Sequence, residues 1–300
     1  MSLIWGRATI LDMPLLDITL AAADLPSQSA VIQAINAAYA DYYIPLSLTD
    51  HAYQTIIERE TVDLTRSVVA IFRGQVIGTC LLGVRDNRGW VGGVGVIPRY
   101  QGKGVARSMM KHLIESARQD GLTSLQLEVV EENNRARNLY ESLGFDYTYR
   151  LHGLVASSNH LHLNGSGPTS CYEPDVASLI DEMQPLVRTH RPWQREESAL
   201  RYVQQNAHGL ALRHQEKDRL LSACVYQSDG YQVGFVDCVA ANALSAVDLL
   251  ASVVRQHPDA RYSYLNVSDN DPFLPILQQV GFQPYIFQLE MLLNLNEDTP

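Results

Sequence analysis

The sequence has no apolar run long enough to cross a membrane, and its start lacks the features of a secretory signal. A membrane-spanning helix needs about 20 consecutive apolar residues, and no such run occurs among the 300 residues. The first five residues, Met1 to Trp5, have neither the basic segment nor the small-residue cleavage site of a signal peptide. We therefore expect a cytoplasmic protein that does not associate with a membrane.

Residues that form disulfides or bind metals are also scarce. The four cysteines show no paired spacing, and three of them lie in apolar stretches typical of strands. Buried free thiols in a reducing compartment are therefore favoured over disulfides. The histidines His160 and His162 have no third ligand nearby, so a solvated pair is favoured over a metal site, and we expect no bound metal.

Basic residues are outnumbered, with 23 Lys and Arg against 33 Asp and Glu and a net charge of -10. Binding to a nucleic-acid backbone requires clustered Lys and Arg, so a nucleic-acid partner is not expected. An acidic balance does tolerate cationic small molecules as substrates.

One loop departs from this acidic background. Residues 98–106, PRYQGKGVA, contain Arg99 and Lys103, and Arg107 follows Lys103 after one helical turn. An apolar strand over residues 91–96 leads into the loop, and an amphipathic helix leaves it. Glycine allows close backbone approach, and the first helical turn presents unpaired amide N–H groups at the positive end of the helix dipole. The loop therefore predicts a phosphate site.

Two common phosphate-binding patterns do not fit this loop. A Walker motif would need a glycine where Ile97 stands. A dinucleotide fingerprint starting at Gly93 would need a glycine at Pro98, and one starting at Gly102 would need it at Arg107. Neither pattern is present.

The remaining pattern, Gln101-x-x-Gly104-x-Ala106, resembles the pyrophosphate-binding motif Gln/Arg-x-x-Gly-x-Gly/Ala of the GCN5-related N-acetyltransferases (GNAT). Residues 133–145, NNRARNLYESLGF, resemble the family's Asn-x-x-Ala-x-x-Leu-Tyr-x-x-x-Gly-Phe segment. The two patterns stand at the family's spacing, joined by one expected helix and one expected strand. The resemblance implies a GNAT fold, which is an α/β (α+β) fold with a mixed, mostly antiparallel sheet, and acetyl-CoA as a co-substrate.

The expected elements of the second half repeat the order of the first. Sliding the chain by 137 residues places Gly281 and Phe282 on Gly144 and Phe145. The connection at residues 240–244, which corresponds to the phosphate loop, contains no glycine. We therefore expect two tandem copies of the fold, although an unrelated second α/β domain is the alternative. The predicted parts are a catalytic domain at residues 1–156, a linker at 157–170 and a degenerate GNAT-like domain at 171–300.

The elements expected in detail come from apolar periodicity and turn signals. In the first half, strands are expected at residues 18–22, 68–72, 76–84, 91–96, 125–130 and 146–151, and helices at 26–38, 50–57, 105–117 and 134–143, with Thr49 as the cap of the second helix. In the second half, strands are expected at residues 209–213, 220–226, 231–240 and 262–267, and helices at 176–189, 196–205 and 244–254.

The resemblance implies roles for two candidate catalytic residues. Tyr140 would lie near the thioester sulfur and protonate the departing thiolate, and Glu128 matches the position of a general base in some relatives. Tyr140 lies two helical turns after Asn133, which leaves Leu139 and Leu143 for the core. The alternatives are an aromatic core position for Tyr140 and a surface or interdomain carboxylate for Glu128.

The resemblance also implies where acetyl-CoA binds. The pyrophosphate would lie on the loop after the fourth strand, and the pantetheine arm would pair with that strand, whose many glycines predict a bulge. The candidate cofactor-binding residues are Val94, Gly95, Val96, Gln101, Gly102, Lys103, Gly104, Val105, Ala106 and Asn133.

The implied reaction is acetyl transfer from acetyl-CoA to a primary amine by direct attack, since no cysteine or serine nucleophile stands out. The acidic balance favours a small cationic acceptor. The opposing hypothesis is a non-catalytic acyl-CoA-binding sensor or scaffold whose degenerate half recruits a partner. Two roles stay open for the second half, which either shapes the acceptor pocket or forms the face of a homodimer.

Overall fold

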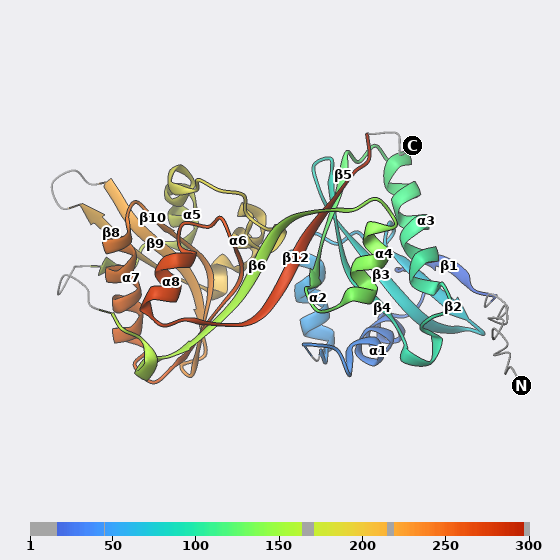
Figure 1. Cartoon of the computed structure of the whole chain (residues 1–300), viewed down its shortest axis with the longest axis horizontal. Helices are drawn as coiled ribbons and strands as arrows, with labels where there is room; N and C mark the ends of the chain where they lie inside the picture. The colour runs from blue at the N-terminus through green and yellow to red at the C-terminus, as the bar shows by residue number, and fades with distance from the viewer. Residues whose placement is uncertain (1–16, 45, 164–170, 215–218, 297–300) are drawn as a thin grey trace, which may run out of the picture. The chain divides into compact units, whose positions relative to one another are not determined.

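A computed structural model describes residues 17–44, 46–163, 171–214 and 219–296 (Figure 1). The α-helices are α1 Gln28–Tyr39, α2 Asp50–Arg59, α3 Val105–Gln119, α4 Asn134–Glu141, α5 Val176–Met183, α6 Glu197–Val203, α7 Ala243–Gln256 and α8 Leu274–Val280. The strands are β1 Thr19–Ala22, β2 Val68–Phe72, β3 Gln75–Arg85, β4 Arg88–Val96, β5 Ser124–Val130, β6 Asp146–Ser157, β7 Cys171–Tyr172, β8 His208–His214, β9 Arg219–Ser228, β10 Gln232–Ala240, β11 Arg261–Ser268 and β12 Gln283–Asn294. Within these ranges no helix is long and apolar enough to cross a membrane.

The predicted fold class is confirmed. The strands pair mostly antiparallel, and parallel pairing occurs between β4 and β5 and between β10 and β11. The helix expected over residues 176–189 ends earlier, at Met183, because Pro185 cannot continue an α-helix and instead enters the single turn η3 Gln184–Leu186. Residues 164–170 of the predicted linker lie outside the described ranges.

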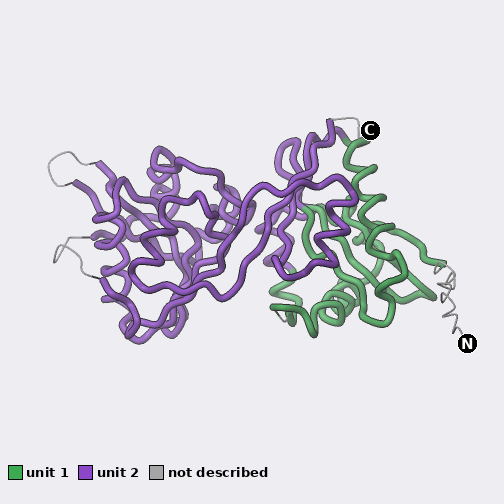
Figure 2. The backbone as a smooth tube through the Cα atoms, in the orientation of Figure 1, with its two compact units in different colours: residues 1–53, 63–82, 91–120 green, residues 54–62, 83–90, 121–300 purple. Residues whose placement is uncertain are grey.

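The chain forms two compact units, which Figure 2 distinguishes by colour. Unit 1 consists of residues 1–53, 63–82 and 91–120, and unit 2 consists of residues 54–62, 83–90 and 121–300. Strands β3 and β4 contribute residues to both units. The domain boundaries expected from the sequence stay a prediction.

In unit 1, strands β1 to β4 follow one another in chain order. The turn between β2 and β3 places Arg73 at φ 50° and Gly74 at φ 78°, and two consecutive positive angles are typical of a two-residue hairpin. The apolar side of α3 that the sequence predicts is buried, with Met109 and Leu113 both fully covered. The helix is thereby held by its core face, and its first turn follows directly from the loop after β4.

In unit 2, the last strand of the chain pairs with two strands from the first half. The strand order is β5-β12-β6-β11-β10-β9-β8-β7, with residues 88–90 of β4 paired to β5. β12 therefore lies between β5 and β6, where Glu290 is directly opposite Glu128. No strand is expected at residues 283–294 from the sequence patterns, so β12 is an addition that comes from the structure.

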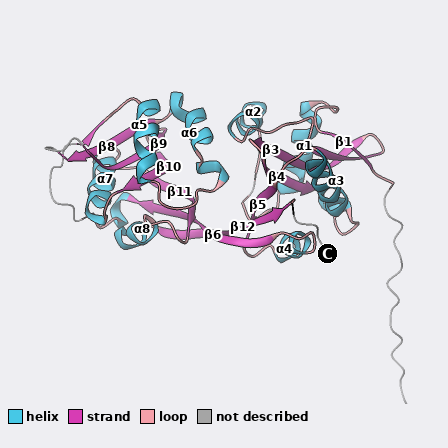
Figure 3. Cartoon of the chain, turned by 90° about the horizontal axis from the view of Figure 1, so that it is seen from above, coloured by secondary structure: helices cyan, strands magenta, loops and turns pink. Residues whose placement is uncertain are grey.

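Helices lie on both faces of the strands β8 to β10 (Figure 3). Cys224 and Cys238 contribute to an apolar cluster with α7 and α8, whereas their neighbours Ala223 and Val239 contribute to a cluster with α5 and α6. This alternation follows from the two-residue period of a strand. Three of the four cysteines are buried and all four are free.

Candidate active site

The glycines of the loop after β4 adopt the left-handed backbone conformation. Gly102 has φ 77° and Gly104 has φ 79°, a conformation that side chains with a Cβ rarely adopt. Gly104 is also the N-cap of α3, and no side chain of the described residues caps this helix end. Because the first four amide N–H groups of an α-helix have no partner inside the helix, they are available to an anion at this exposed position.

The loop is attached to the end of β4 by the side chain of Gln101. Its Nε2 donates a hydrogen bond to the backbone carbonyl of Val96 over 3.0 Å. Arg99 and Lys103 both approach the ring of Tyr100, with Cζ at 4.9 Å and Nζ at 5.9 Å from the ring centre. The side chain of Gln101 therefore connects the loop to β4, and the basic groups of Arg99 and Lys103 lie beside the loop.

The candidate pantetheine-pairing residues of β4 are packed against α1. Gly93 has φ 59°, which is a local distortion of the kind that the glycine-rich strand predicts. The Tyr39 hydroxyl donates to the carbonyl of Val94 over 3.1 Å, and burial raises the pKa of Tyr39. A Cβ at Gly95 would lie 2.8 Å from Ala38 Cβ and 2.9 Å from the Tyr39 ring. Packing against α1 therefore explains the glycine at position 95.

Asn133 and Tyr140 lie at the two ends of α4. Asn133 is the N-cap, and its Oδ1 accepts a hydrogen bond from the Ala136 amide over 3.2 Å. Tyr140 is the buried residue of this helix, and its ring centre lies 6.0 Å from that of Phe145. The leucines expected to face the core, 139 and 143, are only partly buried. Tyr140 therefore contributes to the packing of α4, whatever its chemical role.

Glu128 lies on β5, and one of its carboxylate oxygens accepts two hydrogen bonds. Its Oε2 accepts from Trp90 Nε1 over 2.7 Å and from Gln194 Nε2 over 3.1 Å. Its Oε1 is buried and has no hydrogen-bond partner among the described residues. The two oxygens of this carboxylate are therefore different, and Oε1 is the one left to accept a proton.

Burial raises the pKa of Glu128 from its ordinary value of 4.5 to about 7. The negative charges of Glu290 and Glu60 add to this increase, whereas the hydrogen bonds from Trp90 and Gln194 oppose it because they stabilise the ionised form. A carboxylate with a pKa near neutral pH is suited to general base catalysis.

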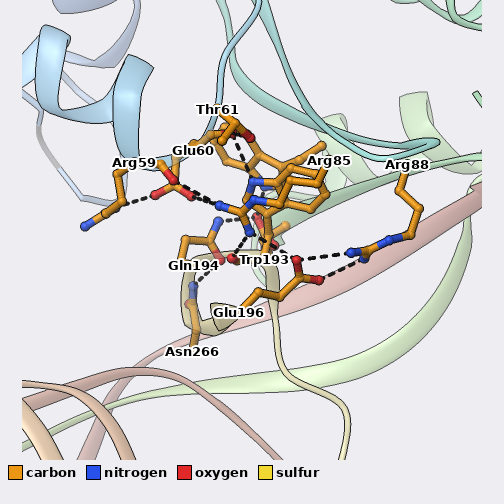
Figure 4. A network of polar contacts seen from close by, with 11 residues as sticks. Arg59, Glu60, Thr61, Arg85, Arg88, Trp193, Gln194, Glu196 and Asn266 are labelled. Atoms are coloured by element: carbon orange, nitrogen blue, oxygen red, sulfur yellow. Dashed lines mark hydrogen bonds and ion pairs between the residues drawn. The ribbon is translucent and has the colours of Figure 1, made fainter. Parts of the chain in front are cut away.

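Both neighbouring carboxylates have partners of their own. Glu290 lies within 3.0 Å of His190 Nε2 and accepts a hydrogen bond from Thr148. The His190 ring stacks on Tyr149 with 4.7 Å between the ring centres. Glu60 pairs with Arg59 over 2.5 Å and with Arg85 over 3.6 Å, and Figure 4 shows this pairing. Glu128 is the carboxylate of this group for which no ion pair occurs within the described ranges.

The sequence patterns did not identify Trp90, Gln194 or Glu290 as neighbours of Glu128. Of the three, Trp90 has the strongest sequence signal, because it directly precedes the glycine-rich part of β4. In the structure it is paired with Gln126, two residues before Glu128. Gln194 and Glu290 are 66 and 162 positions away in the chain, so no local pattern connects them.

The candidate residues fall into the two units. Unit 1 holds residues 94–96 and the loop 101–106, which the Gln101 side chain connects. Unit 2 holds Glu128, Asn133 and Tyr140. His160 and His162 are exposed, and no group of residues suited to a metal ion occurs in the part of the chain that the structure describes.

Comparison with known proteins gives one family. Residues 32–145 match the model of the acetyltransferase (GNAT) family. The fold resembles a tandem GNAT protein from the clavulanic acid biosynthesis pathway, with a TM-score of 0.67 and 16% identity, over 94% of this chain and 100% of that one. It also resembles a GCN5-related N-acetyltransferase from Sphaerobacter thermophilus, with a TM-score of 0.68 and 13% identity, over 95% and 98% of the two chains.

A third similar structure is a GCN5-related N-acetyltransferase from Anabaena variabilis, with a TM-score of 0.63 and 13% identity. The match covers 93% of this chain and 73% of the other. Identities this low show a shared fold alone. The likeness nevertheless extends along nearly the whole chain, well beyond the residues that the family model matches.

Proposed function

We propose that the protein transfers an acetyl group from acetyl-CoA to the primary amine of a small cationic acceptor, and the premise is the match of residues 32–145 to the model of the acetyltransferase (GNAT) family. The match to this family supports acyl-CoA-dependent N-acyltransfer in general. The observation that carries the more specific proposal is Glu128, a carboxylate with a pKa near neutral pH and one buried oxygen that has no donor among the described residues.

The loop after β4 has the properties that a diphosphate requires. Gly102 and Gly104 present backbone without a Cβ, no side chain in the described part of the chain caps the start of α3, and Lys103 is adjacent. In the proposal, residues 101–106 hold the pyrophosphate of acetyl-CoA, residues 94–96 pair with its pantetheine arm, and Asn133 contacts this arm or its neighbourhood.

The proposed reaction is direct attack of the amine on the thioester. The amine nitrogen forms a bond with the carbonyl carbon, the carbon–sulfur bond breaks, and coenzyme A leaves as a thiolate. Glu128 takes the proton that the amine must lose, at Oε1, since Oε2 already accepts two hydrogen bonds. Tyr140 gives a proton to the thiolate, so the charges balance over the whole step.

A panel of amines with acetyl-CoA tests this proposal. The free thiol of coenzyme A is measured as it is released in the presence of polyamines, aminoglycosides, amino-acid amides or short peptides. We expect turnover with at least one cationic amine, and acetylated product of matching mass. Binding of acetyl-CoA without turnover across the panel would instead favour the non-catalytic sensor or scaffold.

Tyr140→Phe separates a proton donor from a residue that only packs. Loss of the hydroxyl is expected to lower kcat by about 100-fold, because general acid catalysis contributes at least that much. The KM for acetyl-CoA should stay nearly unchanged, since the ring that packs against Phe145 is retained. Steady-state kinetics with Tyr147→Phe as the exposed control measures both values. An unchanged kcat would make Tyr140 a core residue without a catalytic role.

A further inference from the structure

Glu128 receives one of its two hydrogen bonds from Gln194, a residue far along the chain. Gln194 lies in the short helix η4 Trp193–Arg195, and its Nε2 donates to Glu128 Oε2 over 3.1 Å. The residues on both sides of Gln194 are almost completely buried, at 0% and 2% exposure. This short segment is therefore packed inside the protein on both sides of Gln194.

Trp193 is held on one side of Gln194 by three interactions, which Figure 4 shows in part. Its indole N–H donates to the carbonyl of Glu60 over 3.2 Å, and its own carbonyl accepts from Arg85 over 2.5 Å. The Arg85 guanidinium also lies 4.1 Å from the centre of the indole ring. An arginine that stacks on an indole and donates to the same residue leaves it little freedom.

Arg195 is held on the other side of Gln194 by buried carboxylates. Its guanidinium pairs with Asp237 over 2.8 Å and with Asp271 over 2.9 Å. It also donates to the carbonyl of Asn266 over 3.1 Å and lies 4.7 Å from the centre of the Tyr264 ring. Both neighbours of Gln194 are therefore buried and held by polar contacts, which restrict the position of its backbone.

The side-chain amide of Gln194 is oriented by Asn266, as Figure 4 shows. Asn266 Nδ2 donates to Gln194 Oε1 over 2.8 Å. An ionised Glu128 can only accept, so Gln194 must present its N–H groups to Glu128 and its oxygen to Asn266. Asn266 has φ 55° and lies at an irregularity of β11 between Tyr264 and Val267, the kind of distortion that redirects a side chain.

We propose that Gln194 and Asn266 are positioning residues that fix the carboxylate of Glu128 so that its Oε1 receives the proton. The inference about the proton rests on the proposed function, whereas the fixed orientation of Glu128 does not. The second half of the chain thereby has a role in the reaction that does not require an acetyl-CoA site of its own.

The charged groups around Glu128 come from several elements. Glu290 on β12 is directly opposite, with His190 as its partner, and Glu60 follows α2, with Arg59 and Arg85 as its partners. None of these charges belongs to Gln194. A substitution of Gln194 therefore changes the hydrogen bonding of Glu128 without removing a charge.

The indole N–H of Trp90 reports the ionisation of Glu128 without any need for activity. Because this N–H donates directly to Glu128 Oε2, its nitrogen-15 NMR resonance should shift as the carboxylate gains a proton. The indole of Trp193, which donates to a backbone carbonyl, is the internal reference. Loss of the titration in Glu128→Gln assigns it to Glu128.

Gln194→Met is expected to raise the midpoint of the Trp90 titration by about one to two pH units, because a hydrogen bond to the charged form is lost. Asn266→Gly keeps the left-handed backbone but frees the Gln194 amide, so we expect a smaller increase in the same direction. Gln227→Met, at an exposed position, is the matched control and should leave the midpoint unchanged.

A midpoint in Gln194→Met equal to that of the control would overturn the proposal, as would the absence of any Trp90 titration between pH 5 and 9. Should Gln194→Met fail to fold, Asn266→Gly carries the same test. A shifted midpoint in a protein that acetylates no amine would keep the positioning role and refute the proposed function. With an active protein, the acid limb of the pH profile of kcat/KM should move with the Trp90 midpoint.

Discussion

Glu128→Gln is expected to lower kcat/KM for acetyl transfer by about 100- to 10,000-fold, which is the contribution of a positioned general base. The glutamine oxygen can still accept from Trp90 and Gln194, so the local structure is retained. Binding of acetyl-CoA should be unchanged. Steady-state kinetics and calorimetric titration of acetyl-CoA measure the two quantities, and Glu115→Gln, on the exposed side of α3, is the matched control.

The pH dependence of kcat/KM should differ between the unchanged protein and this variant, because the pKa of Glu128 is raised. A base works in its ionised form, so kcat/KM of the unchanged protein should fall as the pH decreases through about 7, the value to which burial raises the pKa of Glu128. This limb should be absent in Glu128→Gln. A variant that keeps both the rate and the limb would remove Glu128 from the mechanism.

The stability of the unchanged protein relative to Glu128→Gln should also depend on pH. A carboxyl group whose pKa is higher in the folded state favours folding while it is protonated, and this contribution is lost as the pH rises through the folded-state pKa. For Glu128 the change occurs between 4.5 and about 7. Above pH 7 the glutamine variant should therefore melt at a higher temperature relative to the unchanged protein than it does at pH 5.

Gly104→Glu is expected to weaken acetyl-CoA binding by more than about 100-fold. A carboxylate at the N-cap of α3 would take the place that the proposal gives to the pyrophosphate and would repel it at the same amide groups. A side chain at φ 79° adds backbone strain of roughly 1–2 kcal/mol. Equilibrium dialysis or calorimetry with acetyl-CoA measures the affinity.

The matched control separates backbone strain from the loss of an anion site. Gly121 has φ 78°, and a Cβ built there meets nothing within 4 Å, so Gly121→Glu introduces the same residue in the same backbone conformation outside the loop. We expect this variant to lose a similar amount of stability and to keep its affinity for acetyl-CoA. Retained affinity in Gly104→Glu would refute the assignment of the loop.

Local patterns predict most helices and most strands because their causes lie within a few residues. The spacing of Val105, Met109 and Leu113 predicts the buried side of α3, and Thr49 caps α2 as expected, accepting from the Ala52 amide over 3.1 Å. Gly144 has φ 91° after α4, where the sequence places the helix end. The glycine loop that we propose for acetyl-CoA is likewise predicted from residues that are adjacent in the sequence.

Long-range pairing accounts for what these patterns miss. β12 pairs with β5 and β6, which precede it by more than 120 residues, and such pairing leaves no periodic trace in either segment. The carboxylate of Glu290 is opposite Glu128 only because of this register. In the same way, the hydrogen bond from Gln194 depends on how Arg85, Asp237 and Asp271 hold its neighbours.

Short runs of residues therefore determine the glycine loop after β4, the helix α3 that follows it and the family resemblance. The reason is that hydrogen bonding and side-chain periodicity within one turn or strand are local. The chemical character of Glu128, in contrast, is not determined by its neighbours in the sequence. Its elevated pKa and its orientation arise from burial and from partners at Trp90, Gln194 and Glu290, which the folded chain brings together from three distant segments. Desolvation and charge proximity are properties of a packed interior, and they exist only once the strands have paired.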